Sequence, residues 1–97
     1  MELTMQQREA ARASLAARRE ERLAVLEELI AAGVQVMSED IYVERSVQVA
    51  PGATLLPGTI LRGKTIVAEG CVIGPNTLLE NAVVGKNTTV NASQVYD

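Results

Sequence analysis

An aliphatic residue returns at almost every sixth position through the second half of the chain, and this period constrains the fold more than any other feature. It matches neither an α-helix, with about 3.6 residues per turn, nor an extended strand, with a period of about 2. A small or aliphatic residue lies two places before each member of the series. The series is Val43, Val49, Leu55, Leu61, Val67, Ile73, Leu79, Val84 and Val90. An internal repeat of this kind is typical of a solenoid.

This spacing has a physical explanation. The two residues that flank an outward-facing residue of a strand both point inward, because successive side chains alternate between the two faces. The remaining three residues of each repeat form a corner, and these positions are rich in Gly, Pro and Asn, which favour turns. Three such repeats make a triangular coil of about 18 residues, and successive coils stack as parallel strands. We therefore predict a mainly β fold, a parallel β-helix of hexapeptide type, over residues 41–97. The expected coils are Val43–Ile60, Leu61–Leu78 and Leu79–Gln94.

Residues 1–33 differ in composition and predict a long α-helical arm. They lack Pro and are rich in Ala, Leu, Glu, Arg and Gln, which favour helix. We expect the helix over Met5–Ala32, with Thr4 and Gln7 forming a capping box and Gly33 ending it in the left-handed conformation. Its first half is expected to project or to pack closely through Ala. The apolar stripe expected to pack firmly consists of Leu23, Leu26 and Ile30, with Leu29 beside it.

Charge and composition exclude several classes of function. The net charge is −3 and the only aromatic residues are Tyr42 and Tyr96, which argues against nucleic-acid binding. No apolar run is long enough to span a membrane, and the charged N-terminus does not resemble a signal peptide, so we expect a cytoplasmic location. The chain contains no His and one Cys, which leaves no histidine base and no Cys/His zinc site.

Several polar residues have two interpretations. Cys71 occupies a repeat position and is expected to be a small core residue and not a nucleophile. The charged run at residues 17–22 is expected to be a solvated helix face, with a specific acidic or phosphate partner as the alternative. Arg62 and Lys64 flank Gly63 and are either solvated corner charges or a phosphate-binding pair.

The remaining polar candidates are asparagines and glutamates. The asparagines are expected to be corner residues, with a stacked polar binding strip as the alternative: Asn76, Asn81, Asn87 and Asn91. The glutamates are spaced too differently to assign an acid/base pair: Glu44, Glu69 and Glu80. We therefore predict no catalytic, cofactor-binding or metal-binding residue.

Two passages carry a resemblance to a known family. "PGTILRGKTIVAEGCVIGPNT", residues 57–77, and "LAVLEELIAAGV", residues 23–34, resemble bifunctional N-acetylglucosamine-1-phosphate uridyltransferases/glucosamine-1-phosphate acetyltransferases. The resemblance covers about residues 11–97. It implies that the helix corresponds to the family's interdomain helix and that the coils are the first of its C-terminal left-handed β-helix. The family's full enzyme makes UDP-N-acetylglucosamine for cell-envelope synthesis.

The same resemblance implies that neither catalytic site is present. The family's magnesium-binding Asn corresponds here to Ala11, and its Gly-rich nucleotide loop has no counterpart. The family's acetyltransferase His lies in later coils, and this chain has no His. The leading interpretation is a non-catalytic oligomerisation or scaffold module without cofactors. The alternatives are a minimal acyltransferase with its site between chains and a base such as Glu69 or Glu80, or one piece of a split enzyme.

Self-association is the expected partnership. A coil ending near Val95, Tyr96 and Asp97 would leave an open β-edge, and open edges favour pairing with another chain. A trimer with side faces in contact is favoured by the resemblance, and an end-to-end dimer is the alternative. A separately encoded nucleotidyltransferase domain is a further candidate partner, whereas nucleic acid and membrane are not.

Overall fold

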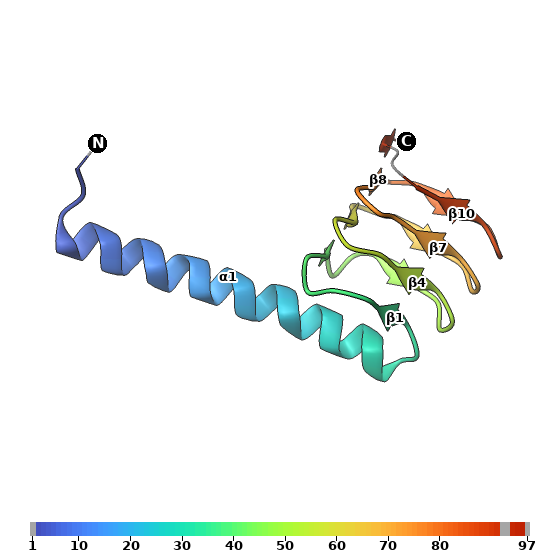
Figure 1. The fold of residues 1–97 in the computed structure, drawn as a ribbon, viewed down its shortest axis with the longest axis horizontal. Coiled ribbons are helices and arrows are strands. Elements are labelled where there is room, and N and C mark those ends of the chain that lie inside the picture. The colour runs from blue at the N-terminus through green and yellow to red at the C-terminus, as the bar shows by residue number, and fades with distance from the viewer. Residues whose placement is uncertain (1, 92–93, 97) are drawn as a thin grey trace.

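The computed structural model describes residues 2–91 and 94–96, and shows one long helix followed by a β-solenoid (Figure 1). The helix, α1, spans Met5–Ala31. The strands within the described residues are two or three residues long. They are β1 (Gln35–Val36), β2 (Tyr42–Val43), β3 (Gln48–Val49), β4 (Thr54–Leu55), β5 (Ile60–Arg62), β6 (Ile66–Val67), β7 (Val72–Ile73), β8 (Leu78–Glu80), β9 (Val83–Val84), β10 (Thr89–Val90) and β11 (Gln94–Tyr96).

Each strand from β1 to β8 pairs with the strand three places later in the sequence, so the strands form three parallel sheets. Their orders are β1-β4-β7-β10, β2-β5-β8-β11 and β3-β6-β9. We call them the first, second and third sheet. This arrangement confirms the predicted solenoid of about three coils, whereas the left-handed winding implied by the family resemblance stays a prediction. The parallel ladder already begins at β1, ahead of the expected boundary at residue 41.

The coils differ in length although their strands stay in register. Gln35 pairs with Thr54, Thr54 with Val72, and Val72 with Thr89, which gives spacings of 19, 18 and 17 residues. The changes in length fall at corners. The inward residues Val36 and Val43 are seven positions apart, whereas Leu79 and Val84 are five apart. Because this interval is seven, β1 does not fit the period of six that the sequence shows from Val43 onward.

The repeat positions form the core, as the period predicts. The fully buried side chains of the two middle coils come from these positions. They are Ala53, Leu55, Thr59, Leu61, Thr65, Val67, Cys71, Ile73, Thr77 and Leu79. Two repeat positions lie in the last described coil and are less buried, because no described coil covers them. Thr88 is exposed and Val90 is partly buried.

The buried threonines satisfy their hydroxyl groups within the corners. Thr59 Oγ1 donates to the carbonyl oxygens of Leu56 at 2.7 Å and Ile73 at 3.1 Å. Thr65 Oγ1 likewise lies 2.7 Å from the carbonyl oxygen of Arg62. A buried hydroxyl without a partner would destabilise the fold. Thr therefore suits this position, since it is small and also binds a free corner carbonyl.

The helix begins and ends nearly where the sequence predicts. Thr4 and Gln7 form the capping box, and Gly33 has φ +101° directly after the C-cap residue Ala32. The second half of α1 covers the first coil, while its first half projects away from the solenoid (Figure 1). The predicted apolar stripe is partly wrong: Val25 and Leu26 are buried, but Ile30 is 55% exposed.

Candidate functional site

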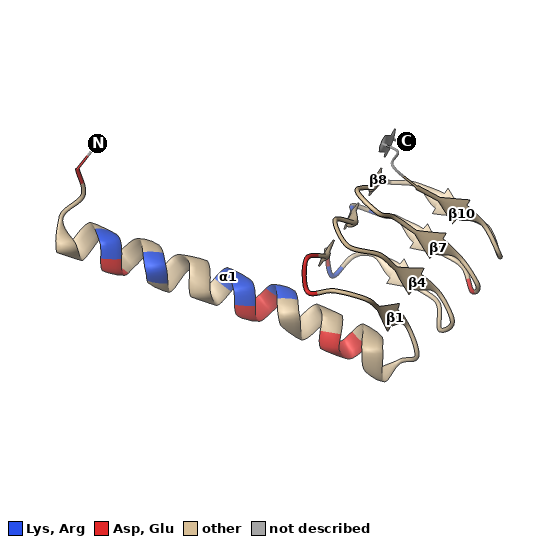
Figure 2. Ribbon diagram, viewed as in Figure 1, with Lys and Arg blue, Asp and Glu red and all other residues tan. Residues whose placement is uncertain are grey.

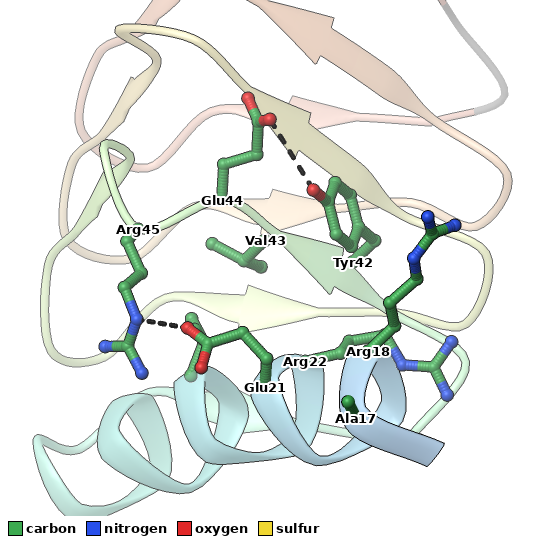
Figure 3. A pocket seen from close by; sticks show the side chains of 9 residues that line it. Ala17, Arg18, Glu21, Arg22, Tyr42, Val43, Glu44 and Arg45 are labelled. Atoms are coloured by element: carbon green, nitrogen blue, oxygen red, sulfur yellow. Dashed lines mark hydrogen bonds and ion pairs between the residues drawn. The ribbon is translucent and has the colours of Figure 1, made fainter. Parts of the chain in front are cut away.

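A cleft separates the middle of α1 from β2 at the base of the second sheet. Its volume is about 720 Å³. The helix contributes Arg18, Glu21 and Arg22 from consecutive turns of one face, because residues three and four apart lie side by side. The solenoid contributes Tyr42 and the residues that follow it (Figure 3). The full lining is Ala17, Arg18, Glu21, Arg22, Val25, Tyr42, Val43, Glu44 and Arg45.

Arg45 and Glu21 close one side of this cleft. Arg45 Nε donates to Glu21 Oε1, and Arg45 Nη1 donates to Glu28 Oε2 at 2.8 Å. The hydrogen bond to Glu21 raises the pKa of the Arg45 guanidinium most, and the hydrogen bond to Glu28 raises it further. The group is therefore a fixed cation at any physiological pH. Arg45 thus tethers the helix to the first corner of the solenoid, although exposed ion pairs contribute little stability.

Arg18 and Arg22 occupy the other side of the cleft, beside the ring of Tyr42 (Figure 3). Within residues 2–91, neither arginine makes an ion pair. Arg22 Nε is buried and has no hydrogen-bond partner among these residues. The expectation that residues 17–22 form a solvated face is therefore wrong for Arg22, which is half-buried against the first coil.

A column of charged residues runs along one edge of the second sheet. Arg62 pairs with Glu80 in register between β5 and β8, and Arg62 Nη2 lies 2.9 Å from Glu80 Oε1. One coil earlier, Glu44 Oε1 accepts from the backbone N–H of Gly63 at 2.8 Å. Glu44, Arg62 and Glu80 are each 18 positions apart, which is one coil. The structure therefore pairs Arg62 with an acid and leaves Lys64 exposed, which does not favour the phosphate-binding pair.

The asparagines are corner residues and do not form a stacked strip. Asn76, Asn81 and Asn87 have φ of 52°, 51° and 58° and occupy successive corners of one coil. Each lies above a glycine of the preceding coil: the backbone N–H groups of Asn76, Asn81 and Asn87 donate to the carbonyls just before those glycines. A stacked column requires spacings of one coil, whereas these residues are five and six positions apart. The polar-strip alternative is therefore wrong for these three, and Asn91 is an exposed residue after β10.

The other candidate residues have structural surroundings. Cys71 is fully buried, and its Sγ lies 2.9 Å from the carbonyl oxygen of Gly85. Glu69 forms an exposed ion pair with Lys86 at 3.2 Å. Among the described residues, no group of three His, Cys, Asp or Glu side chains is placed to hold a metal ion. The one helix in this part of the chain lacks the apolar length to cross a membrane.

Two of the three outer faces of the solenoid carry apolar side chains. The outward residues of the second sheet include Tyr42, Ile60 and Leu78, and those of the third sheet include Ile66 and Val83. Ile66 pairs in register with Val83, and the two are 40% and 75% exposed. The outward residues of the first sheet are mostly polar: they are Gln35, Thr54 and Thr89, together with the apolar Val72.

Comparison with known proteins supports the family resemblance, although no protein-family model matches the chain. Bifunctional protein GlmU of Thermus thermophilus is 45% identical over 60 residues, which is 62% of this chain and 13% of that protein. GlmU of Clostridium acetobutylicum is 36% identical over 59 residues, 61% of this chain and 13% of the relative. GlmU of Bifidobacterium longum is 38% identical over 66 residues, which is 67% of this chain and 14% of that protein.

The chain therefore spans about one seventh of the length of these curated relatives. The matching sequence lies in the C-terminal region of GlmU. The parallel solenoid agrees with the six-residue repeat pattern of residues 43–90. In sequence and in fold, this chain is therefore similar to the C-terminal region of bifunctional protein GlmU.

Proposed function

We propose that this chain is a non-catalytic self-association module, related to the C-terminal region of GlmU and able to act as a scaffold for a partner. One observation carries the proposal: Ile66 and Val83 form an exposed apolar row on the third sheet. Contiguous exposed apolar patches rimmed by polar residues mark sites of protein association. The adjoining second sheet adds Ile60, which is 37% exposed.

The surroundings of the candidate acids and bases support a non-catalytic role. The carboxylate of Glu44 accepts a backbone N–H, and those of Glu69 and Glu80 pair with Lys86 and Arg62. Cys71 is buried without a base beside its thiol among the described residues. A general base needs a carboxylate or imidazole free to take a proton from substrate. None of these groups is arranged in that way.

The proposed assembly is a trimer in which the side faces of the solenoids contact one another. This arrangement would bury Ile66 and Val83. An end-to-end dimer, the alternative, would bury the last coil and leave that row exposed. The two assemblies therefore respond differently to a charge placed on the third sheet, because burying an unpaired charge is costly.

Light scattering on a sizing column tests the proposal with the full chain. We expect a mass three times that of one chain for the wild type and of a single chain for Val83→Lys. Thr89→Lys is the matched control, because Thr89 is exposed on the polar first sheet. This variant should remain trimeric. A monomeric wild type, or a Val83→Lys variant with unchanged mass, would overturn the proposed assembly.

Activity assays test the non-catalytic part separately. The purified chain should catalyse neither acetyl transfer from acetyl-CoA to glucosamine 1-phosphate nor uridyl transfer to N-acetylglucosamine 1-phosphate. Turnover by the chain alone would overturn this part and favour the minimal enzyme. Turnover that appears only with a separate nucleotidyltransferase domain would instead support the split enzyme.

A further inference from the structure

We propose that the cleft between α1 and β2 binds the phosphate group of a small molecule, held by Arg18 and Arg22. The two guanidinium groups belong to residues one helical turn apart on the face of α1 that lines the cleft. Both lie on the Tyr42 side, away from the Arg45–Glu21 pair (Figure 3). The site is separate from the third sheet on which self-association depends.

The first support for this site is the distribution of charge around the helix. Figure 2 shows basic and acidic residues mixed along α1, and three of those in its second half form ion pairs with the solenoid side of the chain. Arg19 pairs with Glu39, and Glu21 and Glu28 pair with Arg45. Within residues 2–91, the cleft arginines Arg18 and Arg22 have no such acid. Two like charges one turn apart repel each other, and an anion between them removes this repulsion.

The second support is the buried Nε–H of Arg22. This atom has no acceptor among the described residues, and a buried donor without a partner is unfavourable. Asp40 lines a smaller hollow together with Arg22 but forms no ion pair with it. The guanidinium is therefore held near the cleft by packing and not by its own ion pair. An oxyanion would supply the missing acceptor once the guanidinium group turns toward the cleft.

The acids of the cleft do not compete for these arginines. Glu21 is held by Arg45, and Glu44 accepts from the backbone N–H of Gly63 and from the hydroxyl of Tyr42. Arg18 and Arg22 are thus the cleft guanidinium groups that have no carboxylate partner among residues 2–91. A phosphate monoester presents three oxygens and matches two guanidinium forks, whereas a carboxylate fills one fork. The half-exposed ring of Tyr42 provides an apolar wall for the group that carries the phosphate.

Titration of the full chain with phenyl phosphate tests this site. We expect saturable binding of one molecule per chain with Kd on the order of 1 mM, measured by calorimetry. Inorganic phosphate, which lacks the ring, should bind more weakly, and so should benzoate, which lacks the phosphate. Benzoate binding as tightly as phenyl phosphate, or no saturable binding, would overturn the proposal.

Two arginine variants locate the site. Arg22→Gln should weaken phenyl phosphate binding at least about tenfold, because it removes charge-assisted hydrogen bonds. Arg12→Gln is the matched control, since Arg12 lies on the exposed first half of α1, and it should bind as the wild type does. Equal weakening in both variants would show nonspecific attraction and overturn the site.

A measurement on the wild type makes the test independent of variant folding. In NMR spectra of the arginine Nε–H groups, phenyl phosphate should move the signals of Arg18 and Arg22. The signals of Arg8 and Arg12 should stay in place. Shifts of similar size at all four arginines would contradict a built site.

Discussion

Substituting Gly63 by Ala tests whether the stacking of corners on successive coils stabilises the solenoid. Gly63 has φ +65° and lies beneath Asn81 of the next coil. A non-glycine residue in the left-handed region costs about 1–2 kcal/mol. A Cβ at this position would also meet the side-chain Oδ1 of Asn81, which accepts from the backbone N–H of Lys64 at 2.8 Å. Losing that hydrogen bond adds about 1 kcal/mol.

We therefore expect Gly63→Ala to lower the free energy of unfolding by about 2–3 kcal/mol. Gly85→Ala is the matched control, because Gly85 does not have a positive φ and a Cβ there meets nothing within 4 Å. Its effect should stay within about 0.5 kcal/mol. Urea denaturation followed by circular dichroism measures both, at one protein concentration, because association shifts apparent stability.

A double variant separates the two contributions. In an Asn81→Gly background the amide is gone, so Gly63→Ala should cost only the backbone contribution of about 1–2 kcal/mol. The difference from the wild-type background measures the coupling between the two corners. Equal effects of Gly63→Ala and Gly85→Ala would refute a stabilising role for the stacked corners.

The helix and the core lead to three further predictions. Thr4→Ala removes the capping box of the projecting half of α1, so helicity at 222 nm should fall while the urea midpoint stays unchanged. Leu26→Ala removes a side chain buried against the first coil and should destabilise the fold by about 2–5 kcal/mol, measured by the same denaturation. Cys71, which is fully buried, should react with a thiol reagent such as dithionitrobenzoate only when the solenoid opens. Rapid reaction in the absence of urea would contradict its core position.

The core of the solenoid was predictable because the geometry of a short strand fixes which residues point inward. Leu55, Leu61, Val67 and Ile73 follow directly from the period of six, and the structure buries all four. The positions of the corners were also predictable, since the corners contain Gly and Asn, which tolerate positive φ better than other residues. No tertiary information was needed at these positions, because each repeat has the same local surroundings.

The face that the helix presents to the solenoid was not predictable. Periodicity along α1 favoured Ile30, but the structure buries Val25 and leaves Ile30 exposed. The turn at Gly33 sets the direction in which α1 crosses the first coil. The spacing of apolar residues along the helix does not reveal this direction. The cleft depends on the same crossing, and for this reason the sequence pattern indicated a solvated position for Arg22.

The charged column was recoverable from the sequence, but only with the right interval. Glu44, Arg62 and Glu80 are each 18 positions apart, and this interval places them in register on neighbouring coils. The glutamates alone do not show this interval, because Arg62 occupies the middle position. In a solenoid, ion pairs are found at intervals of one coil, as they are at intervals of four in a helix.

The coil spacings of 19, 18 and 17 residues also indicate where this architecture accepts changes in length. A residue added or removed at a corner alters one turn, and the next strand begins again with the same side inward. A residue added within a strand would exchange inward and outward side chains, since the side-chain period of a strand is 2. Insertions and deletions in such a chain are therefore confined to the edges of the prism, where each one remains a local event.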